Sequence, residues 1–153
     1  MPDTATRRRD SGDAIGQSPG MIHCTRDGAI ATIALARPEA KNALPTAAWH
    51  ALAEAARGVG DARAVILRSD VPGIFSAGAD VREFEALQCD PALRVTFRTA
   101  MRDAIEAIAA LPMPVIAAID GGCFGAAVAL ILAADIRVAG NHAEFATTPA
   151  RLG

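Results

Sequence analysis

The chain has 153 residues, 52% hydrophobic and 21% charged, which is enough to bury a sizeable core and predicts a single soluble globular domain. Fifteen basic and 17 acidic residues give a net charge of −2, and only 4% of the residues are aromatic. Because nucleic-acid binding needs a basic surface or a row of stacking aromatic side chains, we expect no nucleic-acid partner.

The three cysteines, Cys24, Cys89 and Cys123, are widely spaced and odd in number, a pattern that predicts neither a disulfide framework nor a metal site. A reducing, cytoplasmic location fits this usage best. The longest uncharged apolar run, from Cys123 to Ala134, is well short of the roughly 20 residues of a membrane span. We therefore expect no membrane partner.

Residues 1–20 are polar, and aspartates flank the basic run Arg7-Arg8-Arg9 on both sides. Since no apolar stretch follows, this segment is not typical of a signal peptide, and we predict a disordered N-terminal tail. Residues 21–26 and 29–35 then alternate apolar with polar or small side chains. The Asp27-Gly28 pair between them is a strong signal for a β-hairpin.

A helix is expected next, from about Pro45 to Gly58, with its apolar residues on one face. Residues 64–67 form a short buried strand. Asp90-Pro91 is a typical start for the following helix, in which apolar side chains recur at helical spacing. Pro112 and Pro114 end that helix. Two short strands are predicted near the end of the chain, at 136–139 and 143–146.

The stretch from Met113 to Asp135 organises the rest of the chain. It contains a short apolar strand at 115–119, a glycine-rich turn, and an apolar helix from Ala126 to Ala134 that we predict to be buried. A helix that begins at such a turn directs unpaired backbone N–H groups at whatever lies above the strand end. This arrangement predicts a binding site for developing negative charge.

Two loops of small residues follow strands: Ala-Gly-Ala-Asp at 77–80 and Gly-Ala-Ala at 125–127. An enolate formed from a thioester concentrates negative charge on one oxygen, and each fixed backbone N–H donor stabilises such an oxyanion by about 3 kcal/mol. Small residues let the backbone approach that oxygen. The alternative for either loop alone is that small residues only let a helix pack closely on a strand.

Several motifs resemble those of the enoyl-CoA hydratase/isomerase (crotonase) family. They are Arg37-Pro38, Lys41-Asn42-Ala43-Leu44, Ile74-Phe75-Ser76-Ala77-Gly78-Ala79-Asp80-Val81, Pro114-Val115-Ile116-Ala117-Ala118-Ile119-Asp120-Gly121, Ala134-Asp135-Ile136-Arg137-Val138-Ala139 and Ala143-Glu144-Phe145. The resemblance implies an α/β fold, a spiral of ββα units that occupies residues 21–153 and is incomplete at its C-terminus. It also implies an acyl-CoA substrate that carries coenzyme A with it, so that no separate cofactor is expected, and a homotrimer or hexamer for a full-length chain.

Carried over by position, the resemblance assigns the catalytic oxyanion hole to the backbone N–H groups of Ala79 and Ala126. The backbone from Ala77 to Arg82 would hold the bent coenzyme A near its adenine, and Lys41 would contact a CoA phosphate unless it is only a solvated loop charge. The expected substrate-binding set is Lys41, Ala77, Asp80, Val81, Arg82 and Gly125. No metal is expected.

The departures from the family pattern concern proton transfer. The two glutamates of family hydratases are matched here by Ala129 and Pro149, and a one-residue shift offers only Thr148. Hydration needs a positioned base and acid, which these side chains cannot supply. Residues 145–153 instead resemble a Thr-Pro variant that includes methylmalonyl-CoA decarboxylase-like members, although those carry a His where this chain has Asp80 and a Tyr beyond Gly153.

Three functions therefore remain open: hydration or isomerisation of an enoyl-CoA, a decarboxylase-like variant, and a non-catalytic acyl-CoA-binding fragment. Other carboxylates have structural interpretations. Asp80 is expected at a helix N-terminus, Asp135 beside a turn, and Glu83 on a solvated face or, alternatively, facing the acyl pocket.

Overall fold

The computed structural model describes residues 13–14 and 20–147. A six-stranded sheet has the order β1-β2-β3-β4-β6-β8, and its strands are β1 (Asp13–Ala14), β2 (Ile22–Asp27), β3 (Ile30–Leu35), β4 (Ala64–Ser69), β6 (Val115–Ile119) and β8 (Ile136–Ala139). A three-stranded sheet consists of β5 (Ile74–Ser76), β7 (Gly122–Phe124) and β9 (Glu144–Ala146). The helices are η1 (Pro38–Ala40), α1 (Thr46–Arg57), η2 (Val81–Glu83), α2 (Phe84–Cys89), α3 (Pro91–Ala109) and α4 (Ala126–Leu132).

The predicted hairpin forms between β2 and β3, with Asp27 paired to Ile30. The two turn residues are thus Gly28 and Ala29, one position later than the Asp27-Gly28 pair suggested. Gly28 has a φ of +56°, a conformation that glycine adopts at little steric cost, and this places it inside the turn.

From β3 onward the large sheet is parallel, and β4, β6 and β8 are added in chain order. All four residues of β8 are exposed, whereas one face of strands β3, β4 and β6 is buried, with side chains alternating between the two faces of each strand. The residues of this buried face are Ala31, Ile33, Leu35, Val65, Leu67, Val115, Ala117 and Ile119.

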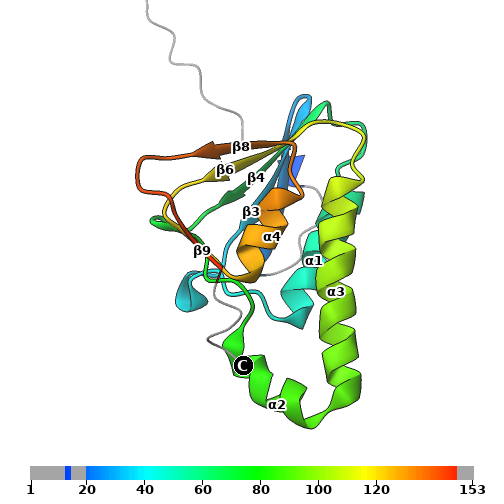
Figure 1. The fold of residues 1–153 in the computed structure, drawn as a ribbon. Coiled ribbons are helices and arrows are strands. Elements are labelled where there is room, and N and C mark those ends of the chain that lie inside the picture. The colour runs from blue at the N-terminus through cyan, green and yellow to red at the C-terminus, as the bar shows by residue number, and fades with distance from the viewer. Residues whose placement is uncertain (1–12, 15–19, 148–153) are drawn as a thin grey trace, which may run out of the picture.

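Helices α1 and α3 pack side by side and cover that buried face, together with α4 (Figure 1). Trp49 and Leu52 of α1 and Phe97 and Ile108 of α3 point into the same core. The N-terminus of α3 is capped by Asp90, whose carboxylate accepts hydrogen bonds from the backbone N–H groups at positions 92 and 93, as the sequence predicted.

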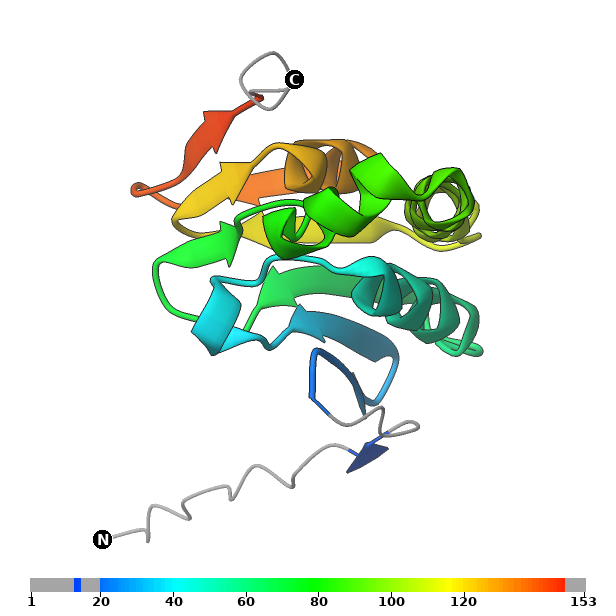
Figure 2. The same ribbon diagram turned by 90° about the horizontal axis from the view of Figure 1, so that it is seen from below.

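The elements repeat as strand, strand, helix. β4 and β5 precede the helices that end with α3, β6 and β7 precede α4, and β8 and β9 follow. Each unit adds one strand to each sheet in chain order, so the chain advances as a spiral (Figures 1 and 2). The predicted α/β spiral of ββα units is confirmed.

The structure differs from the sequence-based expectations in further places. Part of the expected glycine-rich turn, Gly122–Phe124, is the strand β7, which pairs with β5 and β9. Asp13 and Ala14, within the expected disordered tail, pair with Arg26 and Thr25 on the outer edge of β2, where the strand still offers hydrogen-bonding groups. Helix α4 ends at Leu132, and this residue is 65% exposed rather than buried. Among residues 20–147, no helix has the length and apolar character that crossing a membrane requires.

Candidate functional site

The two loops of small residues lie in direct contact. Gly78 has a φ of +93°, and a β-carbon built on it would lie 2.5 Å from the carbonyl oxygen of Phe124 and 3.2 Å from the backbone nitrogen of Ala126. Only glycine fits this contact, because any other side chain would collide with the facing backbone. The close approach of backbone that the small residues of these loops predicted is therefore present at Gly78.

The direction of the Ala79 N–H group follows from its neighbours. The carbonyl of Gly78 accepts a 2.7 Å hydrogen bond from the backbone N–H of Leu44, and the described chain has no cis peptide bond. In a trans peptide the N–H group points opposite to the preceding carbonyl. The N–H of Ala79 therefore points away from Leu44, and it donates to no acceptor within the described residues.

The Ala126 N–H group opens α4 and so has no partner within its own helix. The preceding residue, Gly125, has a φ of +55° and donates its own N–H to the carbonyl of Ala146 at 2.8 Å. No acceptor for the Ala126 N–H exists in the part of the chain that the structure describes. Two N–H groups without an acceptor in the described residues thus belong to two loops that are in contact.

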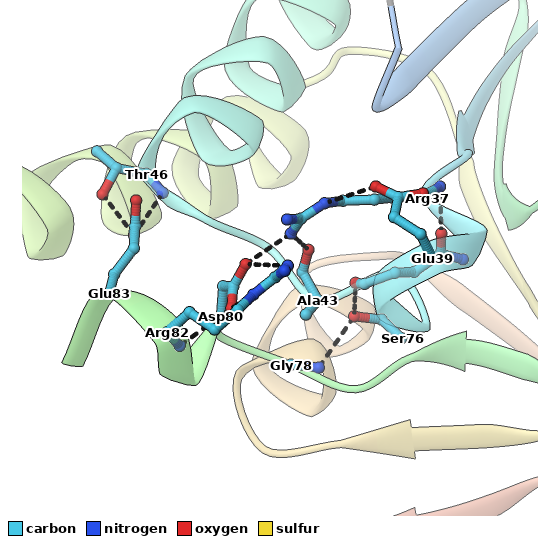
Figure 3. Close-up of polar contacts among 10 residues, drawn as sticks. Arg37, Glu39, Ala43, Thr46, Ser76, Gly78, Asp80, Arg82 and Glu83 are labelled. Atoms are coloured by element: carbon cyan, nitrogen blue, oxygen red, sulfur yellow. Dashed lines mark hydrogen bonds and ion pairs between the residues drawn. The ribbon is translucent and has the colours of Figure 1, made fainter. Parts of the chain in front are cut away.

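The first loop is fixed by a buried asparagine that the sequence analysis assigned no role. Asn42, fully buried with a φ of +54°, donates from Nδ2 to the Phe75 carbonyl at 3.0 Å and to Ser69 Oγ at 2.8 Å. The Ser76 hydroxyl donates to the Asn42 carbonyl at 2.6 Å and accepts from the Gly78 N–H at 3.0 Å (Figure 3). These bonds fasten segment 37–44 to the loop that contains Ala79.

Asp80 is the charged centre of this region. Its side chain is 5% exposed and lies 2.7 Å from Arg37 Nη1 and 3.0 Å from Arg82 Nη2 (Figure 3). Hydrogen bonds from Arg82, and then from Arg37, hold the pKa of the Asp80 carboxyl well below its usual range, although burial opposes them. It also accepts from the Arg82 backbone N–H at the start of η2, which confirms its predicted place at a helix N-terminus.

Glu83 is half-buried, and its side chain is bonded to the start of α1. Its carboxylate accepts 2.9 Å hydrogen bonds from both the backbone N–H and the hydroxyl of Thr46, the first residue of α1 (Figure 3). A carboxylate at a helix N-terminus satisfies unpaired N–H groups and interacts favourably with the helix dipole. No signal in the sequence joined Glu83 to Thr46, because the two residues are 37 positions apart.

The other expected substrate-binding residues surround the same loop. The Lys41 carbonyl accepts from the Ala77 N–H at 2.9 Å, which places the exposed Lys41 beside the exposed Ala77. Val81 is 57% exposed and the Arg82 side chain 62% exposed. These residues are open to a ligand, and their role in holding one stays a prediction.

One of the positions expected to matter for proton transfer lies within the described residues. Ala129 is exposed on α4, and Thr148 and Pro149 lie outside the described residues. Asp135 accepts a 2.8 Å hydrogen bond from the N–H of Val115 at the start of β6 rather than from a turn. In the described residues, no group of three or more His, Cys, Asp or Glu side chains is placed to hold a metal ion.

Two N–H groups that have no acceptor within the described residues lie on loops in contact. Donors of this kind can stabilise negative charge without rearrangement. The class of protein defined by this fold is a spiral α/β protein of repeated ββα units. Family comparison supports a narrower assignment, because residues 25–153 match the model of the enoyl-CoA hydratase/isomerase family. The chain belongs to the enoyl-CoA hydratase/isomerase family.

Individual relatives agree with this assignment. A probable enoyl-CoA hydratase from Mycobacterium avium is 39% identical over 130 residues, which are 81% of this chain and 48% of the relative. A probable mitochondrial enoyl-CoA hydratase from Arabidopsis thaliana is 36% identical over 122 residues, 78% of this chain and 40% of that protein. Mouse mitochondrial methylglutaconyl-CoA hydratase is 43% identical over 90 residues, 59% of this chain and 28% of the relative.

Solved structures show the same relationship in three dimensions. An enoyl-CoA hydratase/carnithine racemase from Magnetospirillum magneticum superposes with a TM-score of 0.84 at 36% identity and covers 90% of this chain. A putative enoyl-CoA hydratase/isomerase family protein from Hyphomonas neptunium gives a TM-score of 0.80 at 36% identity over 86% of this chain. In both cases the match spans 52% of the other chain. This chain therefore spans about half the length of these solved structures, and 28–48% of the three relatives above.

Proposed function

We propose that this chain binds an acyl-CoA thioester and stabilises negative charge on the thioester oxygen with the N–H groups of Ala79 and Ala126. The observation that carries the proposal is that these two N–H groups have no acceptor within the described residues and belong to loops in contact at Gly78. An enolate oxygen is the group that such a pair stabilises. The substrate class we propose is an enoyl-CoA or a related acyl-CoA.

The coenzyme A portion would lie along the backbone from Ala77 to Arg82. Lys41 and Arg82 are exposed at this loop and supply positive charge for phosphate groups. Asp80 would contribute through its backbone, because its carboxylate is already occupied by two guanidinium groups. Coenzyme A would enter as part of the substrate, without a separate cofactor.

The parent reaction we propose is hydration or isomerisation of an enoyl-CoA through a bound enolate. This chain has Ala129 where family hydratases carry one glutamate, and an alanine methyl group cannot transfer a proton. We therefore expect binding without measurable hydration. The non-catalytic acyl-CoA-binding alternative rests on this same residue.

A decarboxylase-like reaction is the second candidate. Loss of carbon dioxide from a 2-carboxyacyl-CoA produces the enolate directly, so the oxyanion site does most of the work and no base is needed to remove a proton. Ala129 cannot transfer a proton, which favours this candidate over hydration.

The experiment has two arms. Calorimetric titration with butyryl-CoA and with free coenzyme A tests binding, and we expect tighter saturable binding of the acyl form. Absence of saturable binding in a folded sample contradicts the proposal.

Turnover of crotonyl-CoA and of methylmalonyl-CoA then tests chemistry. We expect crotonyl-CoA hydration equal to that in buffer, and a hydration rate that Ala129→Gly abolishes would contradict this. Release of carbon dioxide from methylmalonyl-CoA above the buffer rate selects the decarboxylase reading, and its absence selects the non-catalytic one.

We also propose a cytoplasmic location and, for a full-length chain, a homotrimer or hexamer. The first rests on the free cysteines Cys24, Cys89 and Cys123, and the second on the family resemblance. Two of the relatives above are named as mitochondrial, so imaging of a tagged chain is the direct test of location. Light scattering after gel filtration tests the oligomeric state.

A further inference from the structure

The backbone of the loop that contains Ala79 is almost fully committed to hydrogen bonds. The N–H of Ala77 donates to the Lys41 carbonyl at 2.9 Å, that of Gly78 to Ser76 Oγ at 3.0 Å, and that of Asp80 to the Leu44 carbonyl at 3.1 Å. Within the described residues, the Ala79 N–H is the one N–H group of positions 77–80 that has no acceptor. The loop is therefore built to hold one peptide group in one orientation.

The carboxylate of Asp80 extends this hold to two other segments. It accepts a hydrogen bond from Nη1 of Arg37, in the segment before α1, and that same nitrogen donates to the Ala43 carbonyl at 2.8 Å. It also receives Arg82 Nε at 3.0 Å and the Arg82 backbone N–H at 3.1 Å. Asp80 thus joins segment 37–43, its own loop and the η2 turn through a single side chain (Figure 3).

This arrangement is costly to maintain for stability alone. A carboxylate with a 5% exposed side chain and an Arg37 side chain that is 15% exposed both lose hydration, and ion pairs of this kind are weak evidence for added stability. Their geometric effect is specific, because they fix the main chain and the side chain of the residue that follows Ala79. The Asp80 main chain is bonded to Leu44, while its side chain is bonded to Arg37 and Arg82.

We propose that Asp80 is a positioning residue that, through Arg37, holds the Ala79 N–H group in the orientation needed to polarise a bound thioester. This inference rests on the proposed function of the site and deepens it. Asp80 acts through the backbone of its neighbour and does not touch the substrate with its carboxylate. Neutralising Asp80 should therefore weaken polarisation of the thioester more than it weakens binding.

The test measures the carbonyl stretch of butyryl-CoA labelled with ¹³C at the thioester carbon, by difference infrared spectroscopy on the full 153-residue chain. In the unaltered chain the band should move to lower wavenumber on binding. In Asp80→Asn we expect the Kd to stay within about threefold of the unaltered chain while most of the band shift is lost. Asp103→Asn is the matched control, because it neutralises an aspartate of α3 that is paired with an arginine, Arg102. It should change neither quantity.

The outcomes separate the two claims. If the folded, unaltered chain shows no saturable binding, the proposed function fails and this inference fails with it. If Asp80→Asn binds and shows the full band shift, the inference alone is overturned. Should circular dichroism show that Asp80→Asn does not fold, Arg37→Gln replaces it, since this variant leaves Asp80 paired with Arg82. Loss of the shift in that variant supports the inference, and a full shift overturns it.

Discussion

Gly78 packs against the backbone nitrogen of Ala126, so closely that a β-carbon on Gly78 would lie 3.2 Å from that nitrogen and 2.5 Å from the carbonyl oxygen of Phe124. This contact brings together two loops that are almost 50 residues apart in the sequence. The oxyanion site proposed for this chain depends on it, because the N–H donor of the first loop belongs to the very next residue, Ala79.

Gly78→Ala is expected to separate the two loops. The added methyl group would overlap Phe124, and the φ of +93° at this position is unfavourable for any residue with a β-carbon. We expect a loss of stability of about 2–3 kcal/mol together with loss of acyl-CoA binding. Urea unfolding and calorimetric titration measure the two effects.

Gly28→Ala is the matched control for this substitution. Gly28 also has a positive φ, +56°, but a β-carbon there meets nothing within 4 Å. It should therefore cost only the backbone strain of about 1 kcal/mol and leave acyl-CoA binding intact. Equal loss of binding in both variants would show that general destabilisation, rather than the contact with Ala126, explains the result.

The Asp80 carboxylate should give the stability of the chain a distinct dependence on pH. Because its pKa is lowered in the folded protein, its contribution is complete above the pKa of an unfolded aspartate, about 3.9, and is lost as the pH falls toward the lower folded value. Asp80→Asn should destabilise the chain by roughly 3 kcal/mol at pH 6, and this difference should narrow by about 1 kcal/mol at pH 3.

Urea unfolding of both proteins between pH 6 and pH 3 checks this expectation. A difference that stays constant over the whole range would show that the carboxylate acts through shape alone. Asp103→Asn, at a position beside Arg102 where the side chain is 39% exposed, serves as the reference for the removal of one charge and should have a much smaller effect at pH 6.

The three cysteines should react with iodoacetamide in a fixed order. Cys89 is exposed, Cys24 is partly buried with a pKa raised by burial, and Cys123 is fully buried with a pKa raised by burial to about 11. Because the thiolate is the reactive form, we expect Cys89 to be modified first and Cys123 only after unfolding. Peptide mass mapping over time gives the order, and modification of Cys123 in native buffer at the rate of Cys89 would contradict it.

Two leucines provide a matched test of the core. Leu52 of α1 is fully buried, whereas Leu132 at the end of α4 is 65% exposed. Leu52→Ala should cost about 3 kcal/mol of unfolding free energy, and Leu132→Ala less than about 0.5 kcal/mol. A comparable loss at Leu132 would mean that another surface covers the outer side of α4 in solution.

The sequence predicted the fold well wherever the signal is local or periodic. The hairpin at Gly28, the Asp90 cap, the strand Val115–Ile119 and a helix that begins at Ala126 follow from short-range patterns, whereas the strand β7 within the expected glycine-rich turn was missed. The positions of the two proposed oxyanion donors were inferred from the family resemblance, and the structure adds that their loops touch at Gly78.

The remaining features depend on contacts between distant segments, which periodicity does not report. Asp80 is paired with Arg37 and Glu83 with Thr46, at separations of 43 and 37 residues. Asn42 shows why composition alone is insufficient, since a buried asparagine with a positive φ is recognisable only once its partners are known. The exposure of Leu132 was also missed, because an uninterrupted apolar run indicates burial without showing what covers each face.

The most direct measurement of the central claim is the amide ¹H–¹⁵N spectrum of the labelled chain during titration with butyryl-CoA, and separately with free coenzyme A. If Ala79 and Ala126 donate to the thioester oxygen, both amide protons should move downfield with the acyl ligand and much less with free coenzyme A. Saturable binding of butyryl-CoA that leaves these two resonances in place would contradict the account.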